Sequence, residues 1–199
     1  MKRLQGLAAG IARVGAIAGG AMLLAAAVTI CIDIFLRYAF SLTVGGADEL
    51  SGYALAIASA WGFSLALLGR SHIRIDTVYV RVKRRRIRAM LDLLSLASFA
   101  LFIALVAWHG WGVLQQSYAS SSRSQSAIEA PLVIPQGLWF AGLAFCVAVA
   151  LLLLARALVA FLKGDLATLF EAIGSKSAVA EAKEEITAVA HALGGNPGE

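Results

Sequence analysis

The chain has 199 residues, of which 60 % are hydrophobic and only 15 % are charged. Soluble domains carry about 25 % charged residues, so this composition excludes an ordinary water-soluble domain. The formal net charge is +5, but the basic residues follow a membrane topology, described below, and do not indicate nucleic-acid binding.

Four long uncharged segments predict four transmembrane helices. They cover residues 14–32, 50–69, 93–108 and 137–155. A helix needs roughly 20 residues to cross a hydrocarbon core about 30 Å thick. We therefore expect an all-α integral membrane protein, with a four-helix membrane domain over residues 1–163 and spans at about 14–36, 49–69, 89–111 and 137–156. Residues 164–199 are expected to form a cytoplasmic tail that is partly helical or disordered.

The basic residues predict the orientation. Of the 17 Lys and Arg residues, 15 lie before the first span, between the second and third, or after the fourth, whereas Arg37 and Arg123 lie on the other side. The positive-inside rule then places both termini in the cytoplasm. The alternative for the first segment is a cleaved signal peptide, but 19 uncharged residues are many for the apolar core of such a peptide.

Carboxylates mark the two helix ends that meet at the first outer turn. Asp33 and Arg37 are four residues apart and so share a helix face. We expect a structural ion pair, with a proton or cation site at Asp33 as the alternative. Asp48 and Glu49 open the second span, where the positive end of the helix dipole favours carboxylates. Cation binding is the alternative role for Glu49.

The inner loop between the second and third spans predicts a short amphipathic helix in the membrane interface. Its apolar residues recur at helical spacing, with arginines largely on the opposite face. A strand-like alternation fits part of the same loop. The basic run Lys83–Arg88 is expected to bind anionic lipid headgroups.

The third span ends in aromatic residues. Trp108 and Trp111 are expected in the outer interfacial belt. Near the inner end, Asp92 follows Arg88 by four residues, and an ion pair between them is the simplest interpretation.

The second outer loop covers residues 112–136 and leads into the fourth span. Pro131 and Pro135 favour extended backbone there. We expect the fourth span to begin near Gly137, with Trp139 at the membrane interface.

The cysteines and histidines, which could act in catalysis or bind a metal or haem, show no spacing typical of such a site. Cys31 and Cys146 lie in apolar spans without metal-ligand spacing and are expected to be small buried residues. His109 is the one histidine within a span, whereas haem held between helices would need opposed histidines. We therefore predict no enzyme, no cofactor and no metal site.

Four segments of the chain carry a resemblance to a known family. The first span ends with Asp33-Ile34-Phe35-Leu36-Arg37-Tyr38, and the second opens with Asp48-Glu49-Leu50. The inner loop contains Gly69-Arg70-Ser71-His72-Ile73-Arg74-Ile75-Asp76, and Pro131-Leu132-Val133-Ile134-Pro135-Gln136-Gly137-Leu138-Trp139 leads into the fourth span. In order, spacing and topology, residues 14–160 resemble the small (Q-type, DctQ-like) membrane subunit of tripartite ATP-independent periplasmic (TRAP) transporters.

The resemblance implies a transporter of three proteins in the bacterial inner membrane. A periplasmic substrate-binding protein captures an organic anion, often a carboxylate, and a large membrane subunit moves it inward with a sodium gradient. The small subunit would scaffold the large one and help to dock the binding protein.

The resemblance also implies roles for the residues in its segments. The outer-face candidates, which would hold helix ends or meet the binding protein, are Asp33, Arg37, Asp48, Glu49, Ile128, Pro131, Val133, Pro135 and Trp139. The inner-loop candidates, which would contact lipid or the large subunit, are His72, Arg74 and Asp76. The alternative for all of them is a purely internal structural role.

Two other functions fit parts of the sequence. The chief alternative is an independent four-span transporter, acting as a homo-oligomer and using Asp33 as its coupling site. The other is a membrane enzyme or haem protein that uses His109.

Overall fold

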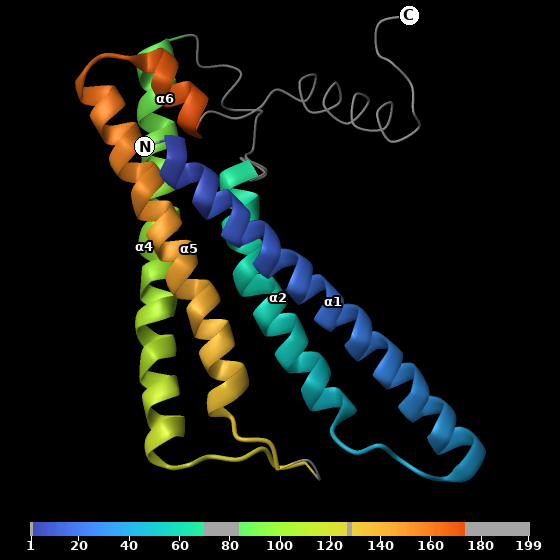
Figure 1. Ribbon diagram of the computed structural model, residues 1–199. Coiled ribbons are helices and arrows are strands. Elements are labelled where there is room, and N and C mark those ends of the chain that lie inside the picture. Colours follow the sequence, from blue (N-terminus) through green and yellow to red (C-terminus); the bar gives the residue numbers. More distant parts are fainter. Residues whose placement is uncertain (1, 70–83, 127–128, 174–199) are drawn as a thin grey trace, which may run out of the picture.

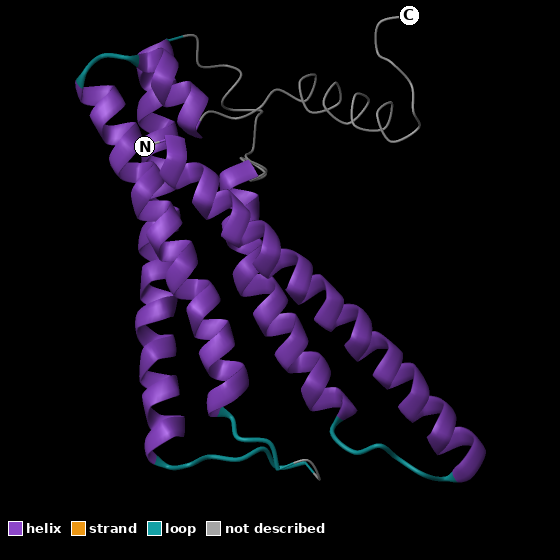
Figure 2. Cartoon of the chain, viewed as in Figure 1, coloured by secondary structure: helices purple, strands orange, loops and turns teal. Residues whose placement is uncertain are grey.

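The computed structural model describes residues 2–69, 84–126 and 129–173 (Figure 1). Its helices are α1 (Lys2–Phe40), α2 (Ala47–Gly69), α4 (Arg85–Ala119), α5 (Val133–Leu162) and α6 (Leu166–Ile173). Within these ranges the chain has no strand, and turns and loops join the helices (Figure 2). The prediction of an all-α protein is confirmed.

Four of the helices, α1, α2, α4 and α5, are long and apolar enough to cross a membrane. This confirms the prediction of four transmembrane helices. The longest, α1, has 39 residues and would extend about 58 Å, well beyond a hydrocarbon core of about 30 Å. It includes the basic segment before Val14 that we expected to precede the helix, because no proline interrupts that segment.

The four long helices form an open row in the order α1, α2, α5, α4. Helix α1 packs on α2, α2 also packs on α5, and α5 also packs on α4, while no other pair of these four is in extensive contact. Figure 1 shows the α1–α2 pair diverging from the α4–α5 pair toward the end that carries the two short connections. Each outer helix of the row therefore leaves most of its surface uncovered.

The apolar core is concentrated between α4 and α5. One cluster joins Leu67 of α2, Leu96 of α4 and Leu153 of α5 to Leu169 of α6. Helix α6 packs on both α4 and α5, so the chain remains part of the packed structure beyond residue 163.

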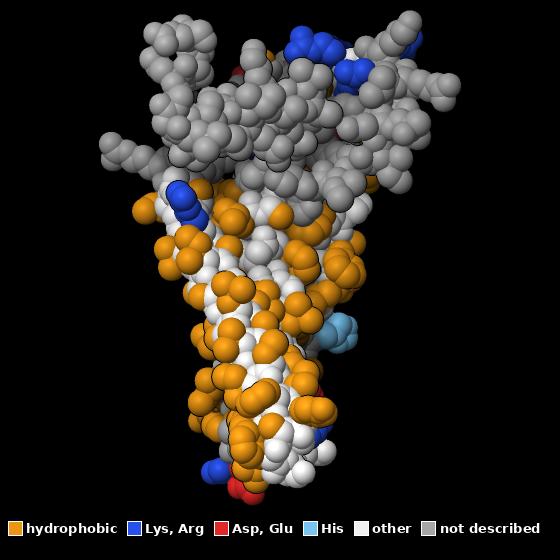
Figure 3. All heavy atoms as spheres, turned by 90° about the vertical axis from the view of Figure 1, so that its right-hand side faces the viewer, with side chains coloured by type: hydrophobic (Ala, Val, Ile, Leu, Met, Phe, Trp, Pro, Cys, Tyr) orange, Lys and Arg blue, Asp and Glu red, His pale blue; other side chains and the backbone are white. Residues whose placement is uncertain are grey.

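The surface is apolar over the length of the helices. Figure 3 shows the α1 side of the molecule, where hydrophobic side chains predominate and most charged side chains lie toward the two ends. Exposed residues on α1 include Leu24 (72 %) and Phe35 (62 %). Such a surface suits a lipid environment or a protein partner.

One expectation about the spans is wrong. Cys31 is exposed, although Cys146 is buried as expected. Helix α4 continues to Ala119, about two turns beyond Trp111, so the helix is longer than the span expected from the sequence. An apolar sequence determines that a helix forms, but it does not mark where the backbone leaves the helix.

The predicted amphipathic helix of the inner loop lies almost wholly outside the described residues. The same holds for the tail after Ile173.

Candidate functional site

The Asp33 carboxylate binds the outer turn that joins α1 to α2. Its Oδ1 accepts hydrogen bonds from the Thr43 hydroxyl and the Val44 N–H, both at 2.7 Å. Its Oδ2 pairs with the Arg37 guanidinium at 2.6 Å, as the spacing in the sequence predicts. The Asp33 side chain is buried, whereas that of Arg37 is 66 % exposed. The Asp33 carboxylate thus connects the end of α1 to the turn through two hydrogen bonds, and an ion pair with Arg37 completes its set of partners.

The outer turn depends on backbone with positive φ. Ser41 (φ 56°) ends α1, and Gly45 and Gly46 (φ 70° and 79°) precede α2. Glycine adopts this region without strain, which explains the paired glycines. The Thr43 hydroxyl accepts a hydrogen bond from the Gly45 N–H at 3.2 Å while it donates to Asp33. Thr43 therefore couples the glycine end of the turn to α1.

Glu49 connects the two outer loops. It lies in the first turn of α2, and its Oε2 accepts a hydrogen bond from the Ser126 hydroxyl at 2.6 Å. The Ser126 hydroxyl is also 3.0 Å from that of Ser124. The α1–α2 hairpin is thereby joined to the loop between α4 and α5. The neighbouring Asp48 is exposed.

The loop between α4 and α5 folds back on itself. The Ser124 N–H donates to the Ala130 carbonyl at 2.9 Å, and the Leu132 N–H donates to the Ser122 carbonyl at 3.1 Å. These bonds flank an antiparallel bridge between residues 123 and 131. The serine-rich segment is therefore held in a defined reversal that presents the Ser126 hydroxyl to Glu49.

The start of α5 corrects the expectation of extended backbone before Gly137. The helix begins at Val133, so Val133 and Pro135 are helical, while Pro131 lies just before the helix and is exposed. A proline in the first helical turn loses no hydrogen bond, because N–H groups there have no acceptor within the helix. Trp139 lies in the second turn, and a Cβ added at Gly110 of α4 would lie 3.1 Å from its ring. Trp139 therefore packs between helices.

Trp61 of α2 packs against two other helices, a role that was not predicted from the sequence. Its ring stacks on Phe145 of α5 with centroids 5.7 Å apart, and its indole N–H donates to the Leu138 carbonyl at 3.2 Å. A Cβ added at Gly15 of α1 or at Gly142 of α5 would lie within 3.0 Å of the Trp61 side chain. One residue thus packs against α1 and α5 together. The available signal was a tryptophan in the middle of a span, where an indole N–H needs a partner.

A second glycine of α1 brings the helices together. A Cβ at Gly19 would lie 2.7 Å from the Ala58 Cα, so the backbones of α1 and α2 approach closely there. With Gly15 this forms the G-x-x-x-G spacing that permits close packing in membranes. Gly20, the next residue along the chain, faces open space.

At the opposite end of the molecule, α6 starts with a capped turn. The Asp165 carboxylate accepts hydrogen bonds from the Thr168 hydroxyl at 2.5 Å and the Thr168 N–H at 3.1 Å. These bonds lower the pKa of Asp165. The Arg85 guanidinium lies 5.7 Å from the centre of the Phe170 ring, a cation–π contact between α4 and α6.

Four candidate residues lie outside the described ranges. They are His72, Arg74 and Asp76 of the inner loop and Ile128 of the outer loop.

The described residues do not assemble a metal or redox centre. No group of three His, Cys, Asp or Glu side chains in residues 2–69, 84–126 and 129–173 could hold a metal ion. His109 is exposed on α4. Asp92 is almost fully buried, at 1 % exposure. The arrangement at the outer end, by contrast, uses carboxylates to fix two loops.

Comparison with known proteins identifies one family. The family model described as "Tripartite ATP-independent periplasmic transporters, DctQ component" matches residues 26–160. The match includes the outer turn, the outer loop and Trp61. No curated protein and no solved structure matches the chain.

Proposed function

Because the chain belongs to the family of DctQ components of TRAP transporters, we propose that it is the small permease subunit of a sodium-driven importer of organic anions of the carboxylate class. Membership makes it the small component of a TRAP transporter, and the family is one of transporter components, not an enzyme class. Together with the four apolar helices, it indicates a multi-pass protein of the inner membrane.

In this proposal the chain scaffolds the large membrane subunit and helps to dock the periplasmic substrate-binding protein. The observation that carries the scaffold role is the internal use of the carboxylates at the outer end. Asp33 and Glu49 bind an arginine, hydroxyl groups and a backbone N–H of this chain. A carboxylate held by an ion pair and two hydrogen bonds is poorly suited to exchange a cation in every transport cycle.

The outer turn and outer loop supply the proposed docking surface. Arg37, Asp48 and Pro131 are exposed there, and the bond between Glu49 and Ser126 holds the two loops together. Such a fixed surface favours docking, since a partner need not order it on binding. The outer-loop residue Ile128 and the helical candidates Val133, Pro135 and Trp139 would shape this surface.

The inner side has its own proposed contacts. His72, Arg74 and Asp76 would fix the inner loop against the large subunit or lipid. The basic run that ends at Arg88 would bind anionic headgroups, because each Lys or Arg near such a surface adds about 1 kcal/mol of attraction.

Uptake by a reconstituted transporter tests the proposal. Proteoliposomes containing this chain and the large subunit, with the binding protein outside, should take up a labelled carboxylate when a sodium gradient is applied. Asp33→Asn should retain most of that uptake, because asparagine still offers an oxygen to Thr43 and Val44. Asp48→Asn is the matched control. Uptake by this chain alone, abolished by Asp33→Asn, would establish the independent transporter instead.

The proposed orientation has both termini in the cytoplasm. In a variant without native cysteines, Gln125→Cys should react with a membrane-impermeant maleimide added to spheroplasts. Lys163→Cys should react only after the membrane is permeabilised. The reverse pattern would invert the topology.

A further inference from the structure

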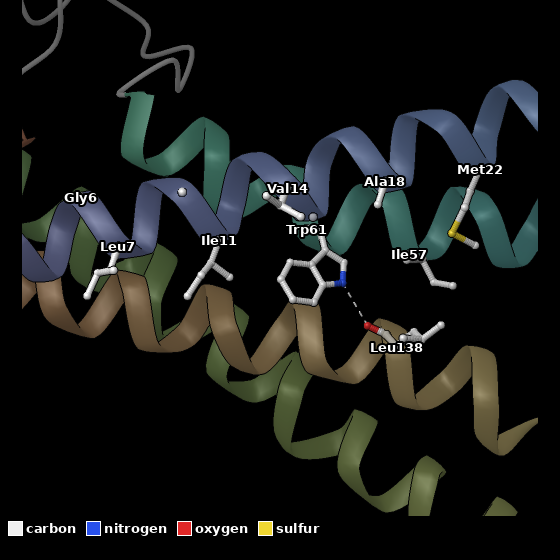
Figure 4. A pocket seen from close by; sticks show the side chains of 12 residues that line it. Gly6, Leu7, Ile11, Val14, Ala18, Met22, Ile57, Trp61 and Leu138 are labelled. Atoms are coloured by element: carbon white, nitrogen blue, oxygen red, sulfur yellow. Dashed lines mark hydrogen bonds between the residues drawn. The ribbon is translucent and has the colours of Figure 1, made fainter.

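An apolar groove of about 600 Å³ runs along α1 (Figure 4). Nine α1 residues between Gly6 and Met22, four of them glycines, form one wall at helical spacing. Ile57 and Trp61 of α2 and Leu138 of α5 complete it. Because the indole N–H of Trp61 donates to the Leu138 carbonyl, the lining offers a ligand apolar contacts and no free side-chain donor.

The groove is long and narrow. Its volume of about 600 Å³ is spread over the roughly 24 Å of helix from Gly6 to Met22. A polymethylene chain fits, since its carbon atoms approach their neighbours to about 3.5–4.0 Å.

Positive charge lies along one half of the groove. Arg156 of α5 donates to the side chain of Gln5, next to the terminal Gly6, and Arg13 of α1 is exposed near the middle of the lining stretch. From Arg13 to Met22 the helix rises about 14 Å, which is half of a hydrocarbon core about 30 Å thick. The half of the groove beyond Arg13 thus has about the depth that the acyl chains of one leaflet occupy, and the basic half from Gly6 to Arg13 lies on its interfacial side.

We propose that this groove binds one acyl chain of an anionic phospholipid, with the headgroup phosphate beside Arg13 and Arg156. The chain would cover the apolar wall of α1, and the arginines would supply charge complementarity to the phosphate. The lipid would fill the space where α1 and α5 have little contact with each other, and so would stabilise the outermost helix of the row.

Photocrosslinking of the full chain tests this proposal. The probe is a phosphatidylglycerol with a diazirine near the end of its acyl chain, in vesicles of phosphatidylglycerol and phosphatidylethanolamine. Peptide mass spectrometry should find adducts on Ala18 and Met22 in clear excess over those on Leu24 and Val28, which are exposed on α1 but do not line the groove. Equal labelling of the two sets would overturn the proposal.

Two glycines of α1 provide a matched pair of variants. A Cβ at Gly10 or at Gly20 meets no atom within 4 Å, so both positions accept a side chain, but Gly10 alone of the two lines the groove. Gly10→Leu should lower the groove adducts about tenfold, as expected for displacing about two buried methylenes. Gly20→Leu should leave them unchanged. Equal effects of the two variants would contradict the proposal.

The headgroup contact has a separate control. Arg13→Gln should lower the adduct yield at Ala18 and Met22, whereas Arg123→Gln, in the outer loop, should not. Loss of yield in both variants, or in neither, would contradict the assigned headgroup position.

Discussion

At the residue scale, the Asp33 carboxylate has three partners within the chain. Variants that remove different numbers of these contacts should differ in thermal stability. Asp33→Ala removes the acceptor for Thr43, Val44 and Arg37 and should lower the thermal midpoint in detergent. Asp33→Asn keeps one acceptor oxygen and should have a smaller effect. Thr43→Val removes two hydrogen bonds, one to Asp33 and one from the Gly45 N–H, and should lower the free energy of unfolding by about 1–3 kcal/mol. Tryptophan fluorescence during heating measures all three.

Asp48→Ala is the control for this series, because Asp48 is exposed in the same part of the molecule. It should leave the midpoint nearly unchanged. If Asp33→Ala matched this control, the three hydrogen-bonded contacts would not stabilise the protein.

The sequence alone predicted the local part of this cluster and not the rest. The pair of Asp33 and Arg37 follows from helical spacing. The bonds from Thr43 to Asp33 and from Ser126 to Glu49 connect residues 10 and 77 positions apart, and their formation depends on turns whose geometry cannot be derived from residue spacing. Trp61 was missed for the same reason, since its partners lie on two other helices.

At the element scale, two adjacent glycines of α1 should respond to alanine in opposite directions. A Cβ at Gly19 would lie 2.7 Å from the backbone of Ala58, whereas Gly20 faces open space. Gly19→Ala should therefore destabilise the protein by about 1–3 kcal/mol through overpacking. Gly20→Ala should stabilise it by up to about 1 kcal/mol, because alanine is the better helix former. Thermal unfolding in detergent compares the two, and effects of the same sign would contradict close packing of α1 on α2.

The start of α6 should respond to acid. The Thr168 hydrogen bonds lower the pKa of Asp165 below its usual value of 3.8. A carboxyl group whose folded-state pKa is depressed contributes stability above its unfolded pKa and loses it as the pH falls through the folded value. Hydrogen-exchange protection of α6, corrected for intrinsic rates, should therefore be constant near neutral pH and fall below about pH 4.

Asp165→Asn is the test variant for this effect. Asparagine also caps helices well but does not titrate, so the acid-dependent loss of protection should disappear. Persistence of the same loss in this variant would assign the effect to another group.

The existence of the helices could be predicted, but their ends and neighbours could not. Uncharged runs long enough to cross a membrane identified α1, α2, α4 and α5. The extra turns of α4 and the early start of α5 at Val133 depend on backbone geometry, to which a Ser-rich or Pro-containing segment is only a weak guide. The order of the helices in the row could not be predicted from the sequence, because the lipid-facing and the buried surfaces of a membrane protein are both apolar.

At the scale of the whole molecule, the open row of helices is consistent with a component of a larger assembly. Helix α1 packs extensively on α2 alone, and large apolar side chains remain exposed along the row. Apolar surface of this extent marks contact with lipid or with a partner protein. The resemblance inferred from four short segments is confirmed by the family match over residues 26–160, and it supplies the partner in our proposal.

The most direct test of the central claim is affinity purification of the tagged full chain from its native membrane in a mild detergent, followed by mass spectrometry. We predict recovery of a large, many-spanning membrane protein in a one-to-one ratio with this chain. The recovery should persist in Asp33→Asn, because that residue is assigned an internal role. Recovery of this chain only with further copies of itself, under conditions in which other membrane complexes remain intact, would contradict the account.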